Sequence, residues 1–389
     1  MDLARYKEGK TRLVVPRVSL TADVPPTSPV FFNPAASVNR DVTVAMTAAA
    51  VGKSFCDAMA GAGARGVRVA KETEASEVVM VDFNPESLKL AKRSAALNRV
   101  GGKCSFALSE TSSYLFSRFG RDQRFDCVDL DPFGTPIRQM QAGLAATAEG
   151  GLLSVTATDT AVLCGVHPTT CARRYGSTPL NNDFHHETGL RILTAALARN
   201  GASLDIGVEP VAAHSTRHYL RVFVRVTPGA TRADAALREL ENVSWCPACG
   251  DVQGEGTSGK PCGVCGKKTR TAGPLWTGQM VHEPLVNAAR KEADASGLRG
   301  AAEILGALPG VDSFPPWSFD IDRICSRLKV PTVSELAVYR QLLKSGHRAM
   351  RTPFEKTGLK TDASHREVER AEKAASSEAG RAEPRPAPA

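Results

Sequence analysis

Short apolar runs alternate with amphipathic stretches along the first 243 residues of the chain. Runs rich in β-branched side chains predict buried strands, and apolar residues repeating every three to four positions predict helices. The predicted strands cover residues 54–59, 77–83, 103–110, 125–133, 150–159 and 218–228. The predicted helices cover residues 42–51, 66–72, 85–99 and 188–201. This alternation predicts an α/β fold with a parallel, doubly wound sheet.

The pattern divides the chain into three parts. Residues 1–243 form the predicted sheet domain. Residues 244–362 are first rich in Cys, Gly and Lys, and then read as short helices separated by Pro and Gly, which predicts a smaller C-terminal domain. Residues 363–389 hold almost no large apolar side chain. Because such a segment buries too little surface to offset the entropy of ordering, we expect a disordered tail.

The composition is that of an ordinary globular protein, with 42% hydrophobic and 23% charged residues. No apolar run approaches the ~20 residues needed to cross a bilayer. The N-terminus has no apolar core of a signal peptide behind its charges. These features predict a cytoplasmic protein without membrane contact.

The net charge of +8 favours a polyanionic partner. The excess is concentrated between Lys329 and Lys360, where seven Lys or Arg residues stand against two Glu, a surplus of five. Such a stretch is either a nucleic-acid contact or a solvated face. The main candidates for nucleic-acid contact are Lys344, Arg348, Arg351, Lys356 and Lys360.

A glycine-rich turn follows the first predicted strand of the sheet. Gly61, Gly63 and Gly66 form a G-x-G-x-x-G pattern, which lets the backbone approach a ligand and fits NAD and S-adenosylmethionine about equally. Asp82 ends the next strand, where a carboxylate commonly accepts hydrogen bonds from ribose hydroxyls. The alternative is that Asp82 only caps the following helix. Glu110 ends the third strand, within reach of an adenine ring.

The fourth predicted strand ends in Asp131, Pro132, Phe133 and Gly134. Nicotinamide enzymes do not need this grouping, whereas amino-group methyltransferases do. An aryl amine is a poor nucleophile until acceptors bind its hydrogens and hold it in line with the methyl donor. The Asp131 carboxylate and the Pro132 carbonyl can accept these bonds, and Phe133 can stack on the base. The alternative, a Pro-Gly turn after a buried strand, does not explain the acid or the aromatic ring.

Four of the ten cysteines form two C-x-x-C pairs separated by twelve residues. The pairs are Cys246 with Cys249 and Cys262 with Cys265. Each pair is followed by a glycine that permits a tight turn. Four thiolates at this spacing suit tetrahedral Zn²⁺ and leave no position open for water, so the predicted zinc is structural.

With these residues in view, the chain resembles the tRNA (guanine-26 N2)-methyltransferase and dimethyltransferase family of archaeal and eukaryotic type, over nearly its whole ordered length. The matching motifs are EGK (8–10), VFFNP (30–34), NRD (39–41), DAMAGAGARG (57–66), VDFNP (81–85), DLDPFG (129–134), YG (175–176), HE (186–187) with GLR (189–191), the paired C-x-x-C and KTD (360–362).

The resemblance implies a class I methyltransferase domain that binds S-adenosylmethionine. By resemblance, Arg40 reaches the methionine carboxylate, Arg65 and Asp82 contact the cofactor, and Asp131 engages guanine. The family usually has an acid followed by Ala after the third strand, where this chain has Glu110 and Thr111. These two residues are the expected adenine contacts.

The resemblance also implies tRNA as the partner and one or two methyl groups added to guanine 26 after base flipping. Basic and aromatic residues interleave over 346–362, which indicates that this segment contacts the tRNA. Two alternatives stay open. The acceptor could be another nucleobase amine or a protein glutamine amine, or the chain could be an inactive, zinc-containing RNA-binding protein.

Overall fold

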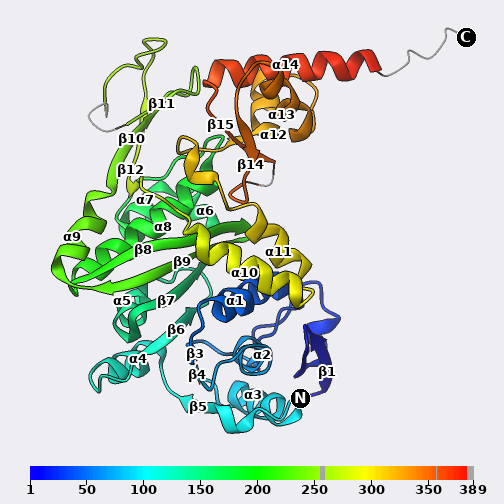
Figure 1. Ribbon diagram of the computed structural model, residues 1–389, viewed down its shortest axis with the longest axis vertical. Coiled ribbons are helices and arrows are strands. Elements are labelled where there is room, and N and C mark those ends of the chain that lie inside the picture. Colours follow the sequence, from blue (N-terminus) through cyan, green and yellow to red (C-terminus); the bar gives the residue numbers. More distant parts are fainter. Residues whose placement is uncertain (255–258, 356, 383–389) are drawn as a thin grey trace, which may run out of the picture.

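The computed structural model describes residues 1–254, 259–355 and 357–382. A seven-stranded sheet in the order β5-β4-β3-β6-β7-β9-β8 is its centre (Figure 1). Its strands are β3 (Ser54–Asp57), β4 (Glu77–Asp82), β5 (Cys104–Leu108), β6 (Phe125–Leu130), β7 (Thr147–Ala157), β8 (Ile206–Thr216) and β9 (Tyr219–Pro228). The first five strands pair in parallel, which confirms the doubly wound fold. The pairings of β7 with β9 and of β9 with β8 are antiparallel. Strand β8 was not predicted because its Gly, Pro and bulge interrupt the apolar pattern.

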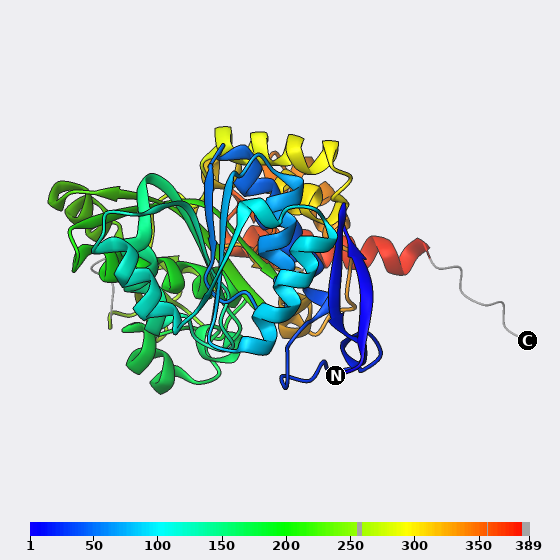
Figure 2. The ribbon, with the colours of Figure 1, turned by 90° about the horizontal axis from the view of Figure 1, so that it is seen from below.

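Helices cover both faces of the sheet (Figures 1 and 2). One face carries α1 (Ser37–Ala49), α2 (Ala64–Glu72) and α3 (Pro85–Leu97). The other carries α4 (Thr111–Phe119), α5 (Ile137–Ala146), α8 (His185–Ala202) and α9 (Ala230–Arg238), with the short α6 (Thr160–Leu163) and α7 (Pro168–Tyr175) beside α8. The buried apolar side chains of the strands and of these helices form one continuous core.

An N-terminal hairpin of β1 (Leu3–Glu8) and β2 (Thr11–Pro16) packs on α3 at one side of the sheet (Figure 2). The backbone N–H of Val14 donates to Ser94 Oγ of α3 at 2.9 Å. Short 3-10 turns, η1 (Arg17–Leu20) and η2 (Pro34–Ala36), lead from the hairpin to α1. Because the hairpin is anchored, Glu8 at its tip is buried against the sheet domain.

The predicted boundary after residue 243 falls inside β10 (Leu240–Trp245). This strand forms a small sheet with β11 (Val252–Gln253) and β12 (Arg270–Trp276). Beyond it, α10 (Glu283–Ala295) and α11 (Arg299–Gly306) pack against α1 and join the first core, ahead of the turn η4 (Val311–Ser313). Trp245 and the apolar residues of 272–311 therefore pack in the same core as the sheet domain.

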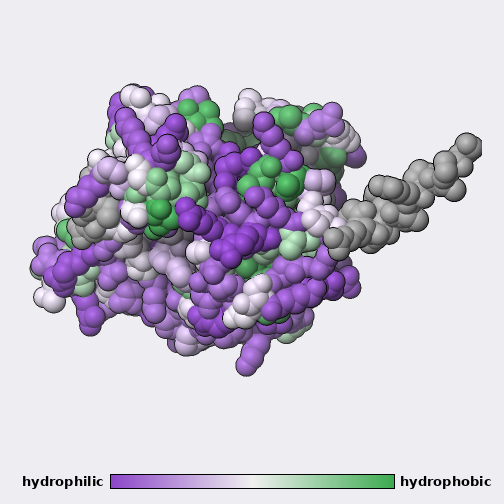
Figure 3. Space-filling view, turned by 90° about the horizontal axis from the view of Figure 1, so that it is seen from above, coloured by the Kyte–Doolittle hydropathy of each residue, from purple (hydrophilic) through white to green (hydrophobic). Residues whose placement is uncertain are grey.

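A second, smaller apolar core lies near the C-terminus. It is built from β13 (Phe319–Asp320), α12 (Ile321–Leu328), α13 (Glu335–Lys344), β14 (Ala349–Arg351), β15 (Gly358–Thr361) and α14 (His365–Ala382). The prediction of a disordered tail is wrong for α14, because Val368, Ala371 and Ala375 recur on one helical face and are buried in this core. Residues 383–389 lie outside the described residues. The face that carries these elements is largely hydrophilic, with small separate apolar patches (Figure 3).

In the described parts of the chain, no helix is both long and apolar enough to cross a membrane.

Candidate active site at the carboxyl edge of the sheet

The carboxyl ends of β3, β4, β5 and β6 meet at one edge of the sheet because these strands are parallel. Asp57 ends β3, Asp82 ends β4, and Asp131 follows β6. The backbone N–H of Ala60 donates to the Val81 carbonyl at 2.9 Å, which brings the glycine-rich turn beside β4. This edge is where open α/β sheets bind their ligands.

Asp82 holds the glycine-rich turn in place. Its Oδ2 accepts the backbone N–H of Gly61 at 2.8 Å, and its Oδ1 accepts that of Asn84 at 2.8 Å. Asn84, not Asp82, is the residue whose side chain caps α3. The interpretation of Asp82 as a helix cap is therefore wrong.

The first two glycines of the G-x-G-x-x-G pattern, which precede α2, differ in their surroundings. Gly61 has a φ of +52°, and the nearest atom that a Cβ there would meet, apart from the adjoining residues, is the Phe31 carbonyl oxygen at 3.4 Å, an ordinary contact distance. Gly63 has a φ of +77°, and a Cβ there would lie 2.5 Å from the Cβ of Ala91 on α3. The sequence thus needs glycine at position 63 for helix packing and for the left-handed backbone.

Glu110 and Thr111 begin α4. The Glu110 carboxylate accepts the backbone N–H groups of Ser112 at 3.0 Å and Ser113 at 2.8 Å as the helix N-cap. Thr111 is buried, and its hydroxyl donates to the Ala58 carbonyl at 2.8 Å. Thr111 therefore connects α4 to the glycine-rich turn. The roles of Glu110 and Thr111 as adenine contacts stay a prediction.

Arg40 is buried and paired with an acid of the N-terminal hairpin. Its guanidinium donates to both carboxylate oxygens of Glu8, at 2.7 and 2.6 Å, and to the Asn33 carbonyl at 3.0 Å. Arg68 donates to the same Glu8 at 3.0 Å. Glu8 lies in the EGK motif, but its pairing with Arg40 was not predicted from the sequence.

Arg65 bonds directly to Asp131 and belongs to a network of two arginines and two aspartates. Its Nη2 donates to the Asp131 carboxylate, and its Nη1 donates to Asp129 at 3.0 Å and to Thr43 Oγ1 at 2.6 Å. Arg221 donates to the same Asp129 and to the same Thr43 hydroxyl at 2.8 Å. The two cations balance two carboxylates, and Arg65 fixes the orientation of Asp131.

Asp129 and Arg221 were missed as site residues. Both are fully buried, and Arg221 belongs to β9, far from Asp129 in the sequence. A usable signal was present, since an arginine stands among the apolar residues of the predicted strand 218–228. A cation at such a position needs a buried anion as its partner.

Asp57 adds a third carboxyl group to this network. It is buried, and its Oδ2 accepts the Gly66 N–H at 2.8 Å. Burial raises the pKa of Asp57 to about 7, against the lowering effect of the Arg65 charge. In its protonated form, Asp57 leaves the two arginines matched by two carboxylates.

Asp131 and Phe133 are the parts of this edge that reach solvent. The Asp131 side chain is 30% exposed, and Phe133 is 65% exposed. The Phe133 ring meets Phe31 edge-to-face, with centroids 4.7 Å apart. Asp131, Pro132 and Phe133 thus offer an anchored acid and an open aromatic face to a planar acceptor.

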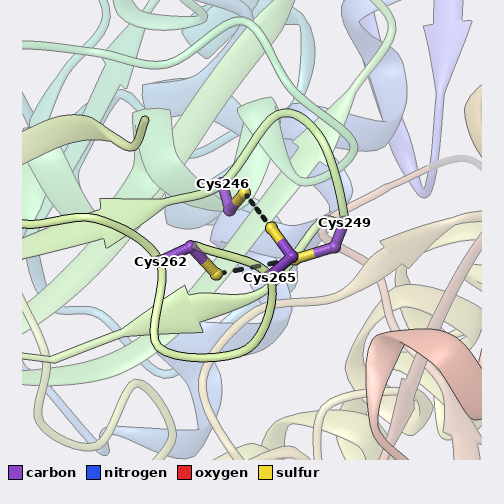
Figure 4. Close-up of side chains that lie close together, drawn as sticks. All are labelled: Cys246, Cys249, Cys262 and Cys265. Carbon is purple, nitrogen blue, oxygen red and sulfur yellow. Dashed lines mark hydrogen bonds between the residues drawn. The ribbon is translucent and has the colours of Figure 1, made fainter. Parts of the chain in front are cut away.

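The four clustered cysteines converge at one end of the β10-β11-β12 sheet (Figure 4). Cys246 and Cys265 have sulfurs 3.5 Å apart, Cys249 and Cys262 have sulfurs 3.6 Å apart, and all four lie within 4.8 Å of one another. The glycine after each pair has a positive φ, +74° at Gly250 and +70° in the second turn. This donor set fits a four-coordinate zinc ion.

The cations predicted to contact tRNA differ in exposure, and several are paired with acids. The prediction of Lys360 as a surface cation is wrong, because the residue is 1% exposed and its ammonium lies 2.9 Å from Glu187 of α8. Arg348 and Arg351 are exposed but paired with acids, Arg348 with Asp362 at 2.9 Å. Lys344 is also exposed, and Lys356 lies outside the described residues.

The sheet order and the acids at its edge define an α/β protein of the class I methyltransferase type. Comparisons with known proteins identify the family. The family described as "N2,N2-dimethylguanosine tRNA methyltransferase" matches residues 9–372. A protein of Methanosarcina acetivorans named tRNA (guanine(26)-N(2))-dimethyltransferase is 36% identical, and the alignment covers 93% of this chain and 96% of that one. A Pyrococcus horikoshii protein of the same name is 32% identical over the same shares.

The solved structure of Trm1 from Pyrococcus horikoshii with S-adenosyl-L-methionine superposes with a TM-score of 0.80. The superposition covers 95% of this chain and 99% of that one, at 30% identity. The chain belongs to the N2,N2-dimethylguanosine tRNA methyltransferase family, which confirms the resemblance inferred from the motifs.

Proposed function

We propose that this chain transfers methyl groups from S-adenosylmethionine to the exocyclic N2 amine of guanine 26 in tRNA and proceeds to the dimethylated base. Family membership and the names of the relatives support this proposal. The observation that carries it is the anchored acid Asp131 beside the exposed ring of Phe133, at the same sheet edge as the glycine-rich turn and Asp82.

The residues at this edge fit the cofactor. Each oxygen of Asp82 receives one backbone N–H and keeps a lone pair for a ribose hydroxyl. Gly61 has no side chain, which lets a ligand approach the backbone of the turn. For Arg40 to bind the methionine carboxylate, its guanidinium must either give up its hydrogen bonds to Glu8 or bind Glu8 and the cofactor carboxylate together. When bound, S-adenosylmethionine supplies a methyl group activated by its sulfonium.

Asp131 orients the acceptor amine. Because Arg65 pairs with Asp131, the carboxylate is held in one direction, and its oxygens can accept an N–H of the guanine amine. Phe133 offers a ring face for the extruded base. Fixed geometry of this kind lowers the barrier by positioning the amine, which is the main need of a weak nucleophile.

A further part of the proposal is a structural zinc at Cys246, Cys249, Cys262 and Cys265. Four sulfurs that converge within 4.8 Å support it, since such a set fills a tetrahedral shell and leaves no site for water.

Nucleoside analysis of tRNA treated with the purified protein and S-adenosylmethionine tests the proposed reaction. We expect N2,N2-dimethylguanosine in a transcript with guanine 26 and none in a transcript with adenine 26. Asp131→Asn should abolish the product and keep cofactor binding. Asp126→Asn is the matched control, because Asp126 lies near the other end of β6 and Asn can keep its acceptor role. Product on another nucleoside, or full turnover by Asp131→Asn, would overturn the proposal.

A further inference from the structure

A second group of metal-binding side chains lies away from the four-cysteine cluster. Cys164 follows α6, and His185 and His186 begin α8. The Cys164 sulfur and one nitrogen from each imidazole lie within 4.8 Å of one another. His185 also lies in a second group with Asp320 and Glu355, which come from the C-terminal elements. The cluster therefore sits where the sheet domain meets the smaller core.

Hydrogen bonds orient both imidazole rings through the same nitrogen. His186 Nδ1 lies 2.6 Å from Glu355 Oε2, and His185 Nδ1 lies 3.0 Å from the Asn182 carbonyl. The Glu355 carboxylate is an acceptor, so it places the ring proton of His186 on Nδ1 and leaves the lone pair of that ring on Nε2. His185 Nδ1 faces the Arg323 Nη1 donor as well as the Asn182 carbonyl, so these contacts orient the ring without selecting one tautomer. Within the described ranges, neither Nε2 has a hydrogen-bond partner. Carboxylates and carbonyls bonded in this way commonly orient histidines that bind metals.

Glu355 is itself held rigidly. It is 4% exposed, and its Oε1 accepts the backbone N–H of His186 at 2.9 Å and of Glu187 at 3.3 Å at the start of α8. Cys164 is 5% exposed and has no hydrogen-bond partner in the described part of the chain. A buried thiol beside two oriented imidazoles forms a preorganised donor set.

The charges around the cluster favour a cation. Arg323 is the opposing charge, with its Nη1 3.2 Å from His185 Nδ1. This guanidinium also donates to the carbonyl of Asn182 and to the side chain of Asn181. Against it stand the carboxylates of Glu355 and Asp320, and the thiolate that Cys164 forms when it binds a metal.

We propose that Cys164, His185 and His186 form a second metal site in this protein, which binds Zn²⁺. One sulfur and two imidazole nitrogens are borderline ligands that suit zinc and exclude Mg²⁺ and Ca²⁺, which prefer oxygen. The site links α6 and α8 to Glu355 between β14 and β15. It uses none of the residues assigned to the methyl-transfer site or to the four-cysteine cluster.

Metal analysis of the purified, zinc-loaded chain tests the site. We expect two zinc ions per chain in the unaltered protein and one in Cys164→Ser. Cys171→Ser, in which another buried thiol outside the cluster is changed, should keep two. Cys249→Ser should remove the zinc ion of the four-cysteine cluster and leave the ion at Cys164 in place, so it distinguishes the two ions.

X-ray absorption at the zinc edge of the unaltered protein removes any dependence on how the variants fold. Imidazole scattering in addition to sulfur is expected, whereas a four-cysteine site alone produces none. Two zinc ions with sulfur-only scattering, or one ion that survives in Cys164→Ser and disappears in Cys249→Ser, would overturn the proposal.

Discussion

Lys360→Met tests whether a residue of the basic segment belongs to the fold or to the tRNA surface. The Lys360 ammonium is 2.9 Å from Oε1 of Glu187, and both side chains are buried. The same oxygen accepts bonds from Arg191, at 3.0 and 2.9 Å. Methionine matches the length of lysine and removes its charge, so the substitution removes the ion pair between β15 and α8, together with the hydrogen bond from the ammonium to the Pro315 carbonyl.

The expected loss of stability follows from the pKa of Glu187. Burial raises this pKa, but the charges of Lys360 and Arg191 outweigh burial and lower it from 4.5 to about 2. That difference of about 2.5 corresponds to about 3 kcal/mol, which is what remains of the attraction of the two cations after the cost of burial. Since Arg191 remains in the variant, we expect a loss of about 2 kcal/mol.

The pH dependence has a definite sign. Because the pKa of Glu187 is lower in the folded protein, its contribution is present above about pH 4.5 and is lost as the pH falls toward 2. The unaltered protein should therefore lose more stability than Lys360→Met over this range.

Urea unfolding followed by tryptophan fluorescence measures this loss. Trp317 is a local reporter, since its backbone N–H donates to Glu187 at 3.2 Å. Lys344→Met is the matched control, because the Lys344 side chain is 64% exposed, and it should unfold like the unaltered protein. Unchanged unfolding of Lys360→Met together with weaker tRNA binding would refute the reasoning and return Lys360 to the surface.

Three further predictions concern the cofactor, the tRNA and the buried network. Asp82→Ala should raise the cofactor Kd about tenfold to a hundredfold in a calorimetric titration, since a charge-assisted hydrogen bond contributes about 1.5–3 kcal/mol; an unchanged Kd would show that Asp82 only shapes the turn. The double variant Arg348→Glu/Arg351→Glu should weaken tRNA binding with a lower salt dependence and leave cofactor affinity alone; normal tRNA binding at physiological salt would make this segment a solvated face. Asp57→Asn should flatten the pH profile of thermal stability, because the raised pKa of Asp57, about 7, gives stability at low pH that is lost as the pH rises through 7; melting temperatures that follow the profile of the unaltered protein would contradict this.

The sequence by itself determined the strands of the parallel sheet, the Asp131-Pro132-Phe133 edge and the cysteine spacing. These features are local, because a strand is specified by a few successive apolar residues and a metal knuckle by four. It also determined the family, since the motifs retain their spacing. The cofactor roles of Arg40, Arg65, Asp82, Glu110 and Thr111 stay predictions.

Only the tertiary structure decided which charges are buried and what they pair with. Lys360 and Glu187 are 173 residues apart, and Arg221 and Asp129 are 92 apart, so no local pattern reveals either pair. In the same way, α14 is ordered because a face of small apolar residues meets a core supplied by α12 and α13. A charged or weakly apolar segment is free in solution until a distant part of the chain supplies its counterion or its apolar partner.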